Sequence, residues 1–490
     1  MHVLLATSEL HPFSKTGGLA DMVGSLAHSL ADAGVQISVI TPLYRGITSR
    51  FPSIKAAQWR FAVRLGNEQF EGQFFRLSPS PELTVWFVQQ DSFYDRAGLY
   101  SSSGLEYLDN ATRFLFLTHA ALILARHLPN PPKIIHSHDW QTGLLPLYLQ
   151  YARAAGDWPT APQSIFTLHN LAYQGSFPST DWALTGLPTA WFHLESAQHF
   201  QRLNFLKAAL TQSTAITTVS PNYAREILTP EYGCGLEGLL IKRANDLTGI
   251  LNGVDYSEWN TTANPALPAS FTSDDLSGKA LCKAAVQTEL GLPVRQDLPL
   301  FTNITRLTDQ KGSELILVAL ERLLLDGVSF QFALLGSGDP LLEQGYKSLA
   351  TRFPNQVSAR IGFDAALAHR LEAGSDFYLM PSRFEPCGLN QLYSLRYGSI
   401  PVVRATGGLH DSIIDPREDA DRANGIKFHT YDSRALEQAI RKALAVWAEP
   451  SWIDHLRRNG MTADFSWKRQ TAHYIALYNE VAQLKPASAR

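Results

Sequence analysis

Short hydrophobic runs alternate with longer amphipathic segments along the first half of the chain. Runs with the composition of buried β-strands lie at residues 2–8, 35–41, 133–138, 163–169 and 215–220. Segments with apolar positions at helical spacing follow them, at residues 22–33, 111–127, 142–155 and 221–228. Strands that alternate with helices in this way predict a doubly wound parallel sheet with helices on both faces.

The same alternation starts again in the second half, after a stretch at 261–273 that is rich in Thr, Ala, Pro and Ser and reads as a connector. Strands are expected at residues 300–305, 329–335, 357–361, 376–380 and 400–404, with a helix at 313–325. Residues 60–89 predict shorter strands, and residues 92–110 show no period and predict a long loop. Because 490 residues exceed one ordinary core, we expect two α/β domains and a last helix at 467–484.

Composition removes several classes of function. The net charge of −3 gives no reason to expect nucleic acid or an anionic membrane surface as a partner. Cys234, Cys282 and Cys387 are too far apart for a zinc motif, and no disulfide framework is expected. The N-terminus lacks the features of a signal peptide, and no apolar run is long enough to span a bilayer. We therefore expect a cytoplasmic protein.

The first candidate site residue is Glu385, in the sequence SRFEPCGLNQLY at 382–393. A buried strand precedes it and a helix is expected to open at Cys387 and Gly388, so Glu385 lies at the carboxyl end of a parallel strand, where α/β sheets bind ligands. The free N–H groups of a helix start favour an anion or a sugar hydroxyl. The alternative for Glu385 is an ordinary loop salt bridge.

A short motif, TGGL-x-D, occurs once in each half of the chain. Residues 15–21 read KTGGLAD and residues 405–411 read ATGGLHD, and each copy follows a strand and precedes a helix. Adjacent glycines allow a ligand close to the backbone, and the helix start behind them favours phosphate. The alternative is a pair of plain strand-to-helix turns.

Two cations in NITRLTDQKG, Arg306 and Lys311, suit a diphosphate whose charge grows as it leaves, although solvated surface cations are the alternative. Asp139 follows a strand and is a candidate polar site residue, whereas His136 and His138 are expected on opposite faces of that strand. The sequence LLGSGDP at 334–340 lacks the third glycine of a dinucleotide fingerprint, which argues against NAD. The Asp419–Ala–Asp421 motif lies in a charged loop and is expected to be solvated.

Taken together, these motifs resemble the bacterial glycogen synthases and plant starch synthases. The resemblance is carried, in the family's order, by KTGGLAD (15–21), HDW (138–140), LHNLAYQG (168–175), TVSPNYA (218–224), GILNGVD (249–255), RLTDQKG (306–312), RFEPCGL (383–389) and TGGLHD (406–411). It implies a GT-B fold, in which two Rossmann-like domains face each other across a cleft. The implied divisions are 1–252, 253–466 and a C-terminal helix at 467–490 that crosses back to the first domain.

The resemblance also implies an activity: retaining transfer of glucose from ADP-glucose to the non-reducing end of an α-1,4-glucan such as glycogen or maltodextrin. No metal and no cofactor are implied, because ADP-glucose is a substrate. Residues implied at the donor phosphates and nucleotide are Lys15, Gly17, Gly18, Arg306, Lys311, Phe363, Thr406, Gly407 and Gly408, with Asp21 ordering the first loop. Residues implied at the transferred glucose are Asp139, His169, Asn252, Glu385, Cys387 and Gly388.

Several alternatives stay open at this stage. Phe363 and His410 depart from the family's usual Tyr and Ala, which affects contacts with the nucleotide. Tyr393 stands where more distant retaining transferases carry a second Glu, so a front-face reaction and a double displacement both remain possible. The choice of ADP-glucose over UDP-glucose rests on the family alone, and the oligomeric state is open. A glycan phosphorylase, a non-catalytic glucan-binding protein and an NAD oxidoreductase are the rival classes.

Overall fold

The computed structural model describes residues 1–102 and 104–484, and its contacts divide the chain into two compact units. The first unit contains Met1–Val219, Ala224–Gly253 and the segment from Trp467 onward; the second contains Ser220–Tyr223 and Val254–Ser466. The short segment Ser220–Tyr223 groups with the second unit, where the Ser220 hydroxyl donates to the Pro386 carbonyl at 2.6 Å. The division expected between residues 252 and 253 assigned this segment to the first domain instead.

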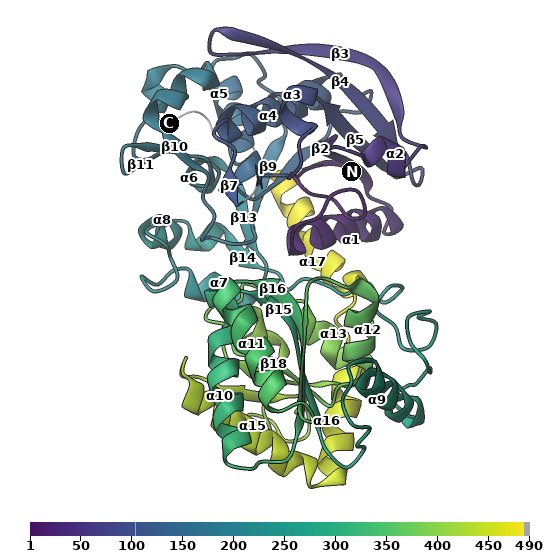
Figure 1. Cartoon of the computed structure of the whole chain (residues 1–490). Coiled ribbons are helices and arrows are strands. Elements are labelled where there is room, and N and C mark those ends of the chain that lie inside the picture. The colour runs from purple at the N-terminus through teal and green to yellow at the C-terminus, as the bar shows by residue number, and fades with distance from the viewer. Residues whose placement is uncertain (103, 485–490) are drawn as a thin grey trace. The chain divides into compact units, whose positions relative to one another are not determined.

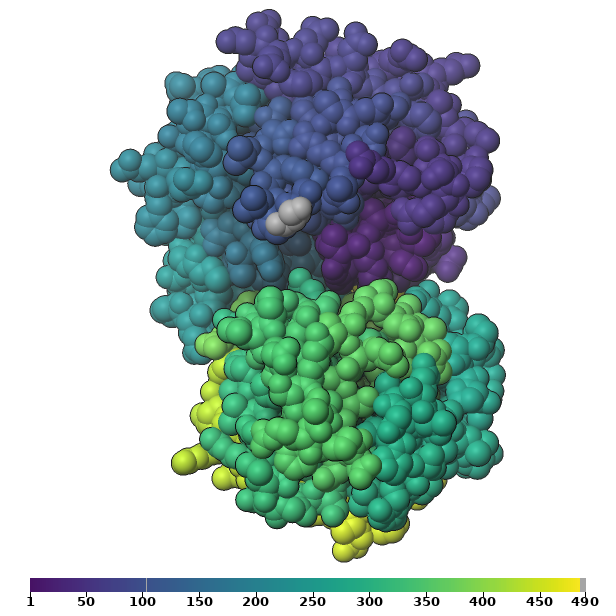
Figure 2. All heavy atoms as spheres, in the orientation of Figure 1, coloured from purple at the N-terminus to yellow at the C-terminus, as the bar shows by residue number. Residues whose placement is uncertain are grey.

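The first unit is built on a sheet of nine strands. Their order is β14 (Leu247–Gly249), β13 (Ala215–Thr218), β9 (Gln163–Leu168), β8 (Ile134–His138), β1 (His2–Ala6), β2 (Gln36–Pro42), β5 (Leu83–Gln89), β4 (Glu68–Leu77) and β3 (Lys55–Leu65). The strands from β14 to β5 are parallel, and β4 and β3 extend the sheet as an antiparallel hairpin. This long curved hairpin forms the upper margin of the unit as drawn (Figures 1 and 2).

Helices cover the first sheet and close its core. They are α1 (Gly18–Asp32), α2 (Ile47–Arg50), α3 (Asp91–Tyr94), α4 (Asn110–His127), α5 (Leu145–Ala154), α6 (Phe205–Gln212), α8 (Glu237–Lys242) and α17 (Trp467–Gln483), with α7 (Pro221–Glu226) shared between the units. The last helix, α17, runs beside α1, where the Thr471 hydroxyl donates to that of Ser29 at 2.8 Å (Figure 1). Tyr474, Tyr478 and Val481 bury one face of α17 in the core, as the helical spacing predicts.

Two segments of the first unit differ from the prediction. Residues 92–110 are not structureless: they include part of α3 and the hairpin β6 (Ser101–Ser102) and β7 (Leu105–Glu106). The fully buried Arg113 ties this segment down, because its guanidinium donates to the carbonyl groups of Phe93 and Leu99 at 2.8 and 2.9 Å. The helix expected at 142–155 is broken into a 3₁₀ turn (Trp140–Thr142) and α5.

The second unit has a parallel sheet of six strands, in the order β17 (Val357–Ile361), β16 (Gln331–Gly338), β15 (Leu300–Leu307), β18 (Phe377–Met380), β19 (Ile400–Arg404) and β20 (Ile426–Phe428). The chain enters at β15, moves outward to β17, and returns to the other side of β15 at β18. The order of the strands therefore reverses between β15 and β18, and loops at this point leave room for a ligand.

Helices lie on both faces of the second sheet. They are α9 (Ser277–Glu289), α10 (Ser313–Leu325), α11 (Pro340–Arg352), α12 (Ala365–Gly374), α13 (Asn390–Arg396), α14 (Gly407–Ser412), α15 (Ser433–Trp447) and α16 (Pro450–Thr462). Side chains from α10, α11, α15 and α16 share one core with Phe301 and Phe332, whereas α9 and α12 pack against Leu300 and Leu335 in another. In both units, none of the described helices combines the length and the apolar character that crossing a bilayer demands.

A buried ionic cluster joins three elements of the second unit. The Asp376 carboxylate, 3% exposed, lies 2.7 Å from the Lys283 ammonium and 2.5 Å from the Arg457 guanidinium, and it accepts the Leu300 N–H at 2.9 Å. These two cations outweigh the cost of burial and lower the pKa of Asp376. The cluster holds β18 to α9 and α16.

We predict that Asp376→Ala destabilises the protein by about 3–5 kcal/mol, because the buried Lys283 ammonium loses its counter-charge. The lowered pKa means that wild type keeps this contribution above about pH 4 and loses it as the pH falls further. Chemical denaturation at pH 7 measures the loss, with Asp297→Ala, at an exposed pair with Arg295, as the matched control. Equal effects of the two substitutions would contradict the assignment.

Candidate functional site

The candidate residues of the first unit lie after the carboxyl ends of its central strands. The order of the strands reverses between β1 and β8, and the loops that follow β1, β8, β9 and β14 carry Lys15, Asp139, His169 and Asn252. Because parallel strands end at the same edge of a sheet, these loops surround one region of the first unit.

The loop after β1 is organised by Glu9, which sequence reasoning missed. This carboxylate is 3% exposed and accepts the N–H groups of Thr16 and Gly17 at 2.5 and 3.3 Å, together with the Tyr100 hydroxyl at 2.7 Å. One of the two amides expected at the donor phosphates, that of Gly17, is therefore already bonded within the chain. The sequence did offer a signal for Glu9: an acidic residue shortly before an expected helix start, where free N–H groups need an acceptor.

Lys15, at the tip of this loop, pairs with Asp21 on the first turn of α1. Their ammonium and carboxylate groups are 2.8 Å apart, and the Lys15 side chain is 47% exposed. The exposed ammonium is thus held near the helix start while remaining accessible. Gly18, the first residue of α1, is exposed as well, and a side chain at Gly17 would meet open space.

Asp139 and His169 are joined directly. Asp139 adopts a left-handed backbone with φ of 56°, and its carboxylate accepts the His169 N–H at 2.8 Å. Burial raises the pKa of Asp139 to about 7, against the lowering effect of the amides of His169 and Asn170. The structure thereby brings together two candidate residues from neighbouring strands.

The ring of His169 is the last of a row of three imidazoles, after His136 and His138. The prediction that His136 and His138 lie on opposite faces of β8 is wrong: alternate residues of a strand share a face, and their ring centroids are 4.2 Å apart. His138 Nδ1 lies 3.1 Å from His169 Nε2. Burial lowers the pKa values of all three rings, so they are neutral at pH 7.

Asn252 is a further polar candidate at this edge, in the loop after β14. Its side chain is 5% exposed, and its Oδ1 atom has no hydrogen-bond partner among the described residues. A buried amide oxygen without a partner is costly unless a ligand supplies a donor. The next residue, Gly253, is closely packed, because a Cβ atom there would lie 2.7 Å from Trp467.

The second unit gathers its candidates around Glu385. The Lys311 ammonium lies 2.7 Å from a Glu385 carboxylate oxygen, which also accepts the Ser382 hydroxyl at 3.0 Å. Glu385 is 5% exposed and its partner Lys311 is partly buried. Lys311 comes from the loop after β15 and Glu385 from the loop after β18, so the pair spans the point where the strand order reverses.

Glycines let the neighbouring loop approach this pair. Gly407 has φ of +45°, and a Cβ atom there would lie 1.9 Å from the Glu385 carbonyl oxygen; one at Gly408 would lie 2.0 Å from the Cys387 carbonyl oxygen. The Gly408 N–H donates to the Glu385 carbonyl at 3.1 Å. Thr406, just before α14, and Cys387 are buried. Backbone contact thus fixes the second TGGL segment against the Glu385 loop.

The helix after Glu385 starts later than predicted. Helix α13 begins at Asn390, not at Cys387 and Gly388, because Gly388 takes a left-handed φ of +73°. The Gln391 side-chain amide donates to the carbonyl groups of Cys387 and Gly388 at 3.0 and 3.1 Å. Its oxygen, Oε1, has no hydrogen-bond partner among the described residues. The turn is therefore held by a side chain that the sequence pattern did not single out.

Two other predicted residues of the second unit, Arg306 and Phe363, are exposed. Arg306, near the end of β15, is exposed and makes no ion pair with a described residue. Phe363 follows β17, which is separated from β18 by β16 and β15, and it is 88% exposed. Tyr431, which sequence reasoning missed, lies under Arg383, 4.3 Å from ring centroid to guanidinium, and donates to the Asp309 carbonyl at 3.0 Å.

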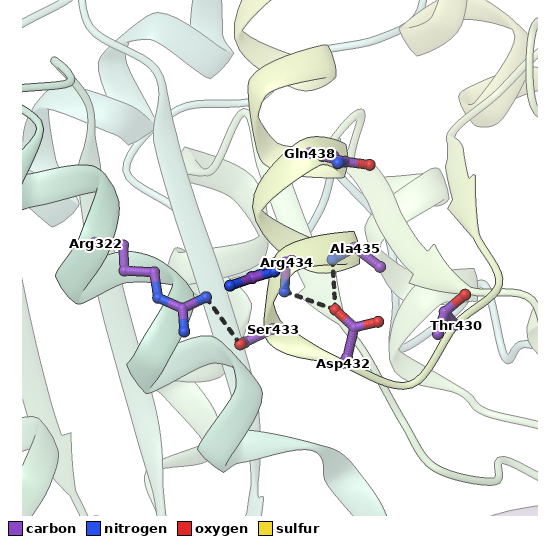
Figure 3. Close-up of a pocket in the computed structure, with 7 residues that line it drawn as sticks. All are labelled: Arg322, Thr430, Asp432, Ser433, Arg434, Ala435 and Gln438. Atoms are coloured by element: carbon purple, nitrogen blue, oxygen red, sulfur yellow. Dashed lines mark hydrogen bonds between the residues drawn. The ribbon is translucent and has the colours of Figure 1, made fainter.

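A separate hollow of about 510 Å³ lies at the start of α15, lined by Arg322, Thr430, Asp432, Ser433, Arg434, Ala435 and Gln438 (Figure 3). None of the predicted site residues lines it. The Asp432 carboxylate accepts the N–H groups of Arg434 and Ala435 at 2.8 and 2.9 Å, so the helix start already carries its own anion. The candidate residues of each unit lie instead at the edge of that unit's own sheet.

Comparisons with known proteins agree with the motifs. A model of the starch synthase catalytic domain matches residues 2–242, and one of the glycosyl transferases group 1 matches residues 291–453. The chain is 46% identical to a glycogen synthase from Anaeromyxobacter dehalogenans, over 98% of this chain and 100% of that protein. It is 42% identical to one from Syntrophotalea carbinolica, over 99% and 100%.

A solved structure is similar along the whole chain. The catalytic domain of starch synthase IV from Arabidopsis thaliana, bound to ADP and acarbose, superposes with a TM-score of 0.88 at 33% identity, covering 99% of each chain. A sucrose-phosphate synthase from Thermosynechococcus elongatus, at 17% identity and a TM-score of 0.60, shares the fold alone. The two α/β units are thus those of the GT-B fold.

The raised pKa of Asp139 leads to a pH-dependent prediction. Folding favours the protonated acid, so the stabilising contribution is complete below about pH 4 and is lost as the pH rises through 7. Asp139→Asn cannot ionise and should escape this loss. The thermal unfolding temperature of wild type should therefore fall relative to that of the variant between pH 5 and pH 8. A constant difference across this range would show that Asp139 is ionised throughout.

Proposed function

The chain belongs to the family of bacterial glycogen synthases and plant starch synthases, and on that premise we propose how its residues perform the family's reaction. It is a glycosyltransferase that moves glucose from ADP-glucose to an α-1,4-glucan. The acceptor is the non-reducing end of glycogen or of a maltodextrin, and the reaction takes place in the cytoplasm. No cofactor takes part, since ADP-glucose is itself the donor substrate.

The observation that carries this proposal is the Lys311–Glu385 pair at the edge of the second sheet. Lys311 is a cation that can stabilise the charge of a leaving diphosphate, and the exposed Arg306 lies near the end of β15, the strand that precedes the Lys311 loop. We assign both cations to the diphosphate of the donor, beside Thr406, Gly407 and Gly408. In the first unit, we assign Lys15 and the Gly18 amide to phosphate binding, and Asp21 pairs with Lys15.

Glu385 has a different role, because its second carboxylate oxygen remains able to accept a hydroxyl hydrogen. We assign it to the hydroxyl groups of the transferred glucose, together with the backbone at Cys387 and Gly388. In the first unit, Asn252 and His169 are assigned to the same sugar, supported by the open Oδ1 of Asn252. Phe363, exposed after β17, is assigned to the nucleotide.

The stereochemistry that we propose is retention through a front-face reaction. The diphosphate leaves, the sugar develops oxocarbenium character, and the acceptor hydroxyl attacks from the face that the diphosphate leaves, giving its proton to a phosphate oxygen. A double displacement would need a carboxylate nucleophile. Asp139 is poorly suited to that role, because its pKa is raised to about 7 and one of its oxygens accepts the His169 N–H. Tyr393, which stands where more distant retaining transferases carry a second Glu, has no carboxylate and stacks on Trp259 with ring centroids 3.6 Å apart.

One assay tests the proposed activity directly. Radiolabelled glucose is offered as ADP-glucose or as UDP-glucose to a maltooligosaccharide, and the product is digested with an α-1,4-specific amylase. We expect incorporation from ADP-glucose, release of all label by the amylase, and unchanged turnover after exhaustive treatment with EDTA, since cationic side chains stabilise the diphosphate. Activity that EDTA abolishes and Mg²⁺ or Mn²⁺ restores would contradict the metal-independent reaction, and label taken from UDP-glucose alone would contradict the donor.

We also predict that Glu385→Gln lowers kcat by roughly a hundredfold or more, because a carboxylate bond to a sugar hydroxyl tightens at the transition state. The melting temperature should change little, since Lys311 keeps 18% of its side-chain surface exposed and the amide oxygen can still accept from its ammonium group and from the Ser382 hydroxyl. Glu289→Gln, at a partly exposed pair with Arg370, is the matched control and should keep full activity. Full turnover by Glu385→Gln, or its failure to fold, would refute this role.

A further inference from the structure

His138 connects the sheet core of the first unit to a residue that we assign to the sugar. It is the last residue of β8, it is fully buried, and its Nδ1 lies 3.1 Å from Nε2 of His169. On its other side its ring packs against His136, with centroids 4.2 Å apart. Nothing in the mechanism described above uses His138, although it is the side chain that contacts the His169 ring.

The protons of these rings can be assigned by counting donors and acceptors. A neutral imidazole carries one N–H, so a single hydrogen lies between His138 and His169. His138 Nε2 is buried and has no partner among the described residues. If that nitrogen carried the proton, a donor would be orphaned in the core, which proteins avoid more strictly than an unused acceptor. The proton of His138 is therefore on Nδ1, and it is donated to His169.

The far side of the row keeps His138 in its orientation. His136 Nδ1 lies 2.8 Å from the Tyr478 hydroxyl on α17, and His136 Nε2 lies 2.6 Å from the Thr167 hydroxyl. Both nitrogens of His136 are thus engaged, which fixes the plane of the ring against which His138 packs. The Thr167 hydroxyl is itself 2.6 Å from that of Thr217 on the next strand.

We propose that His138 is a positioning residue for glucosyl transfer, which holds the His169 ring in the tautomer that carries its proton on Nδ1. Because His169 Nε2 accepts from His138, its Nδ1–H is the group left to donate to a sugar oxygen. The Asp139 carboxylate fixes the backbone of the same residue at 2.8 Å, so ring and main chain are held from two sides. The functional part of this proposal rests on the assignment of His169 to the transferred glucose.

Two substitutions at one position separate positioning from stability. His138→Leu removes the donor to His169 but fills the space with an apolar side chain and removes an unpartnered buried nitrogen, so its melting temperature should not fall. His138→Asn can place an amide N–H where Nδ1 stood. We expect His138→Leu to lower kcat about tenfold or more with less than about a threefold change in KM, and His138→Asn to recover most of kcat.

The matched control is His119→Leu. His119 is a half-buried imidazole of α4 whose Nε2 also lacks a partner among the described residues, and it packs on Tyr148 rather than on His169. This variant should keep wild-type kcat. Equal kcat for His138→Leu and wild type, or equal losses for His138→Leu and His138→Asn, would overturn the proposal.

A spectroscopic measurement tests the tautomer without any activity. In protein labelled with ¹⁵N-histidine, long-range ¹H–¹⁵N spectra identify the protonated nitrogen of each ring, and loss of a signal in His169→Gln assigns His169. We expect Nδ1–H for both His138 and His169 in wild type, and a shift of His169 toward Nε2–H in His138→Leu. A wild-type His169 that carries its proton on Nε2 would refute the proposal even if the donor assay succeeds; a failed donor assay would refute the function and leave this result standing.

Discussion

The ion pair between Lys311 and Glu385 is the interaction on which the second unit's site depends. Its atoms are 2.7 Å apart, and Glu385 is almost fully buried, so removing the ammonium would leave a carboxylate without its counter-charge. The two loops must therefore be held at a fixed separation. The Arg383 N–H donates to the Gln310 carbonyl at 2.9 Å, and Gly312, with φ of +67°, lets the first loop pass the Pro381 carbonyl, which a Cβ atom would meet at 2.3 Å.

A buried carboxylate also organises the first unit, but with a different partner. Glu9 holds the backbone of the first TGGL segment through the amides of Thr16 and Gly17, whereas the glycines of the second TGGL segment pack on the Glu385 loop. The two copies of the motif are therefore held in place by different interactions. In the first, a side-chain anion occupies a helix start and leaves Lys15 exposed; in the second, the absence of side chains lets two loops touch.

The sequence alone predicted the alternation of strands and helices well, because buried parallel strands are continuous apolar runs with clear limits. Residues 313–325, 357–361 and 400–404 coincide with α10, β17 and β19. The errors lie where single side chains or glycines override the pattern. Arg113 orders residues that looked like a loop, and Gly388 delays the start of α13. Glu9, Tyr431 and Gln391 were missed because their partners are distant in sequence or are backbone groups. The site residues were found from motifs, and their positions at strand ends follow from the fold, but their partners did not follow from the sequence.

The central claim is that Lys311 and Glu385 act as one unit on the diphosphate-sugar. A double-mutant cycle in kcat/KM with Lys311→Met and Glu385→Gln tests this most directly. We expect the double variant to be about as impaired as the worse single variant, with a coupling on the order of tenfold or more. Losses that simply multiply would contradict the account.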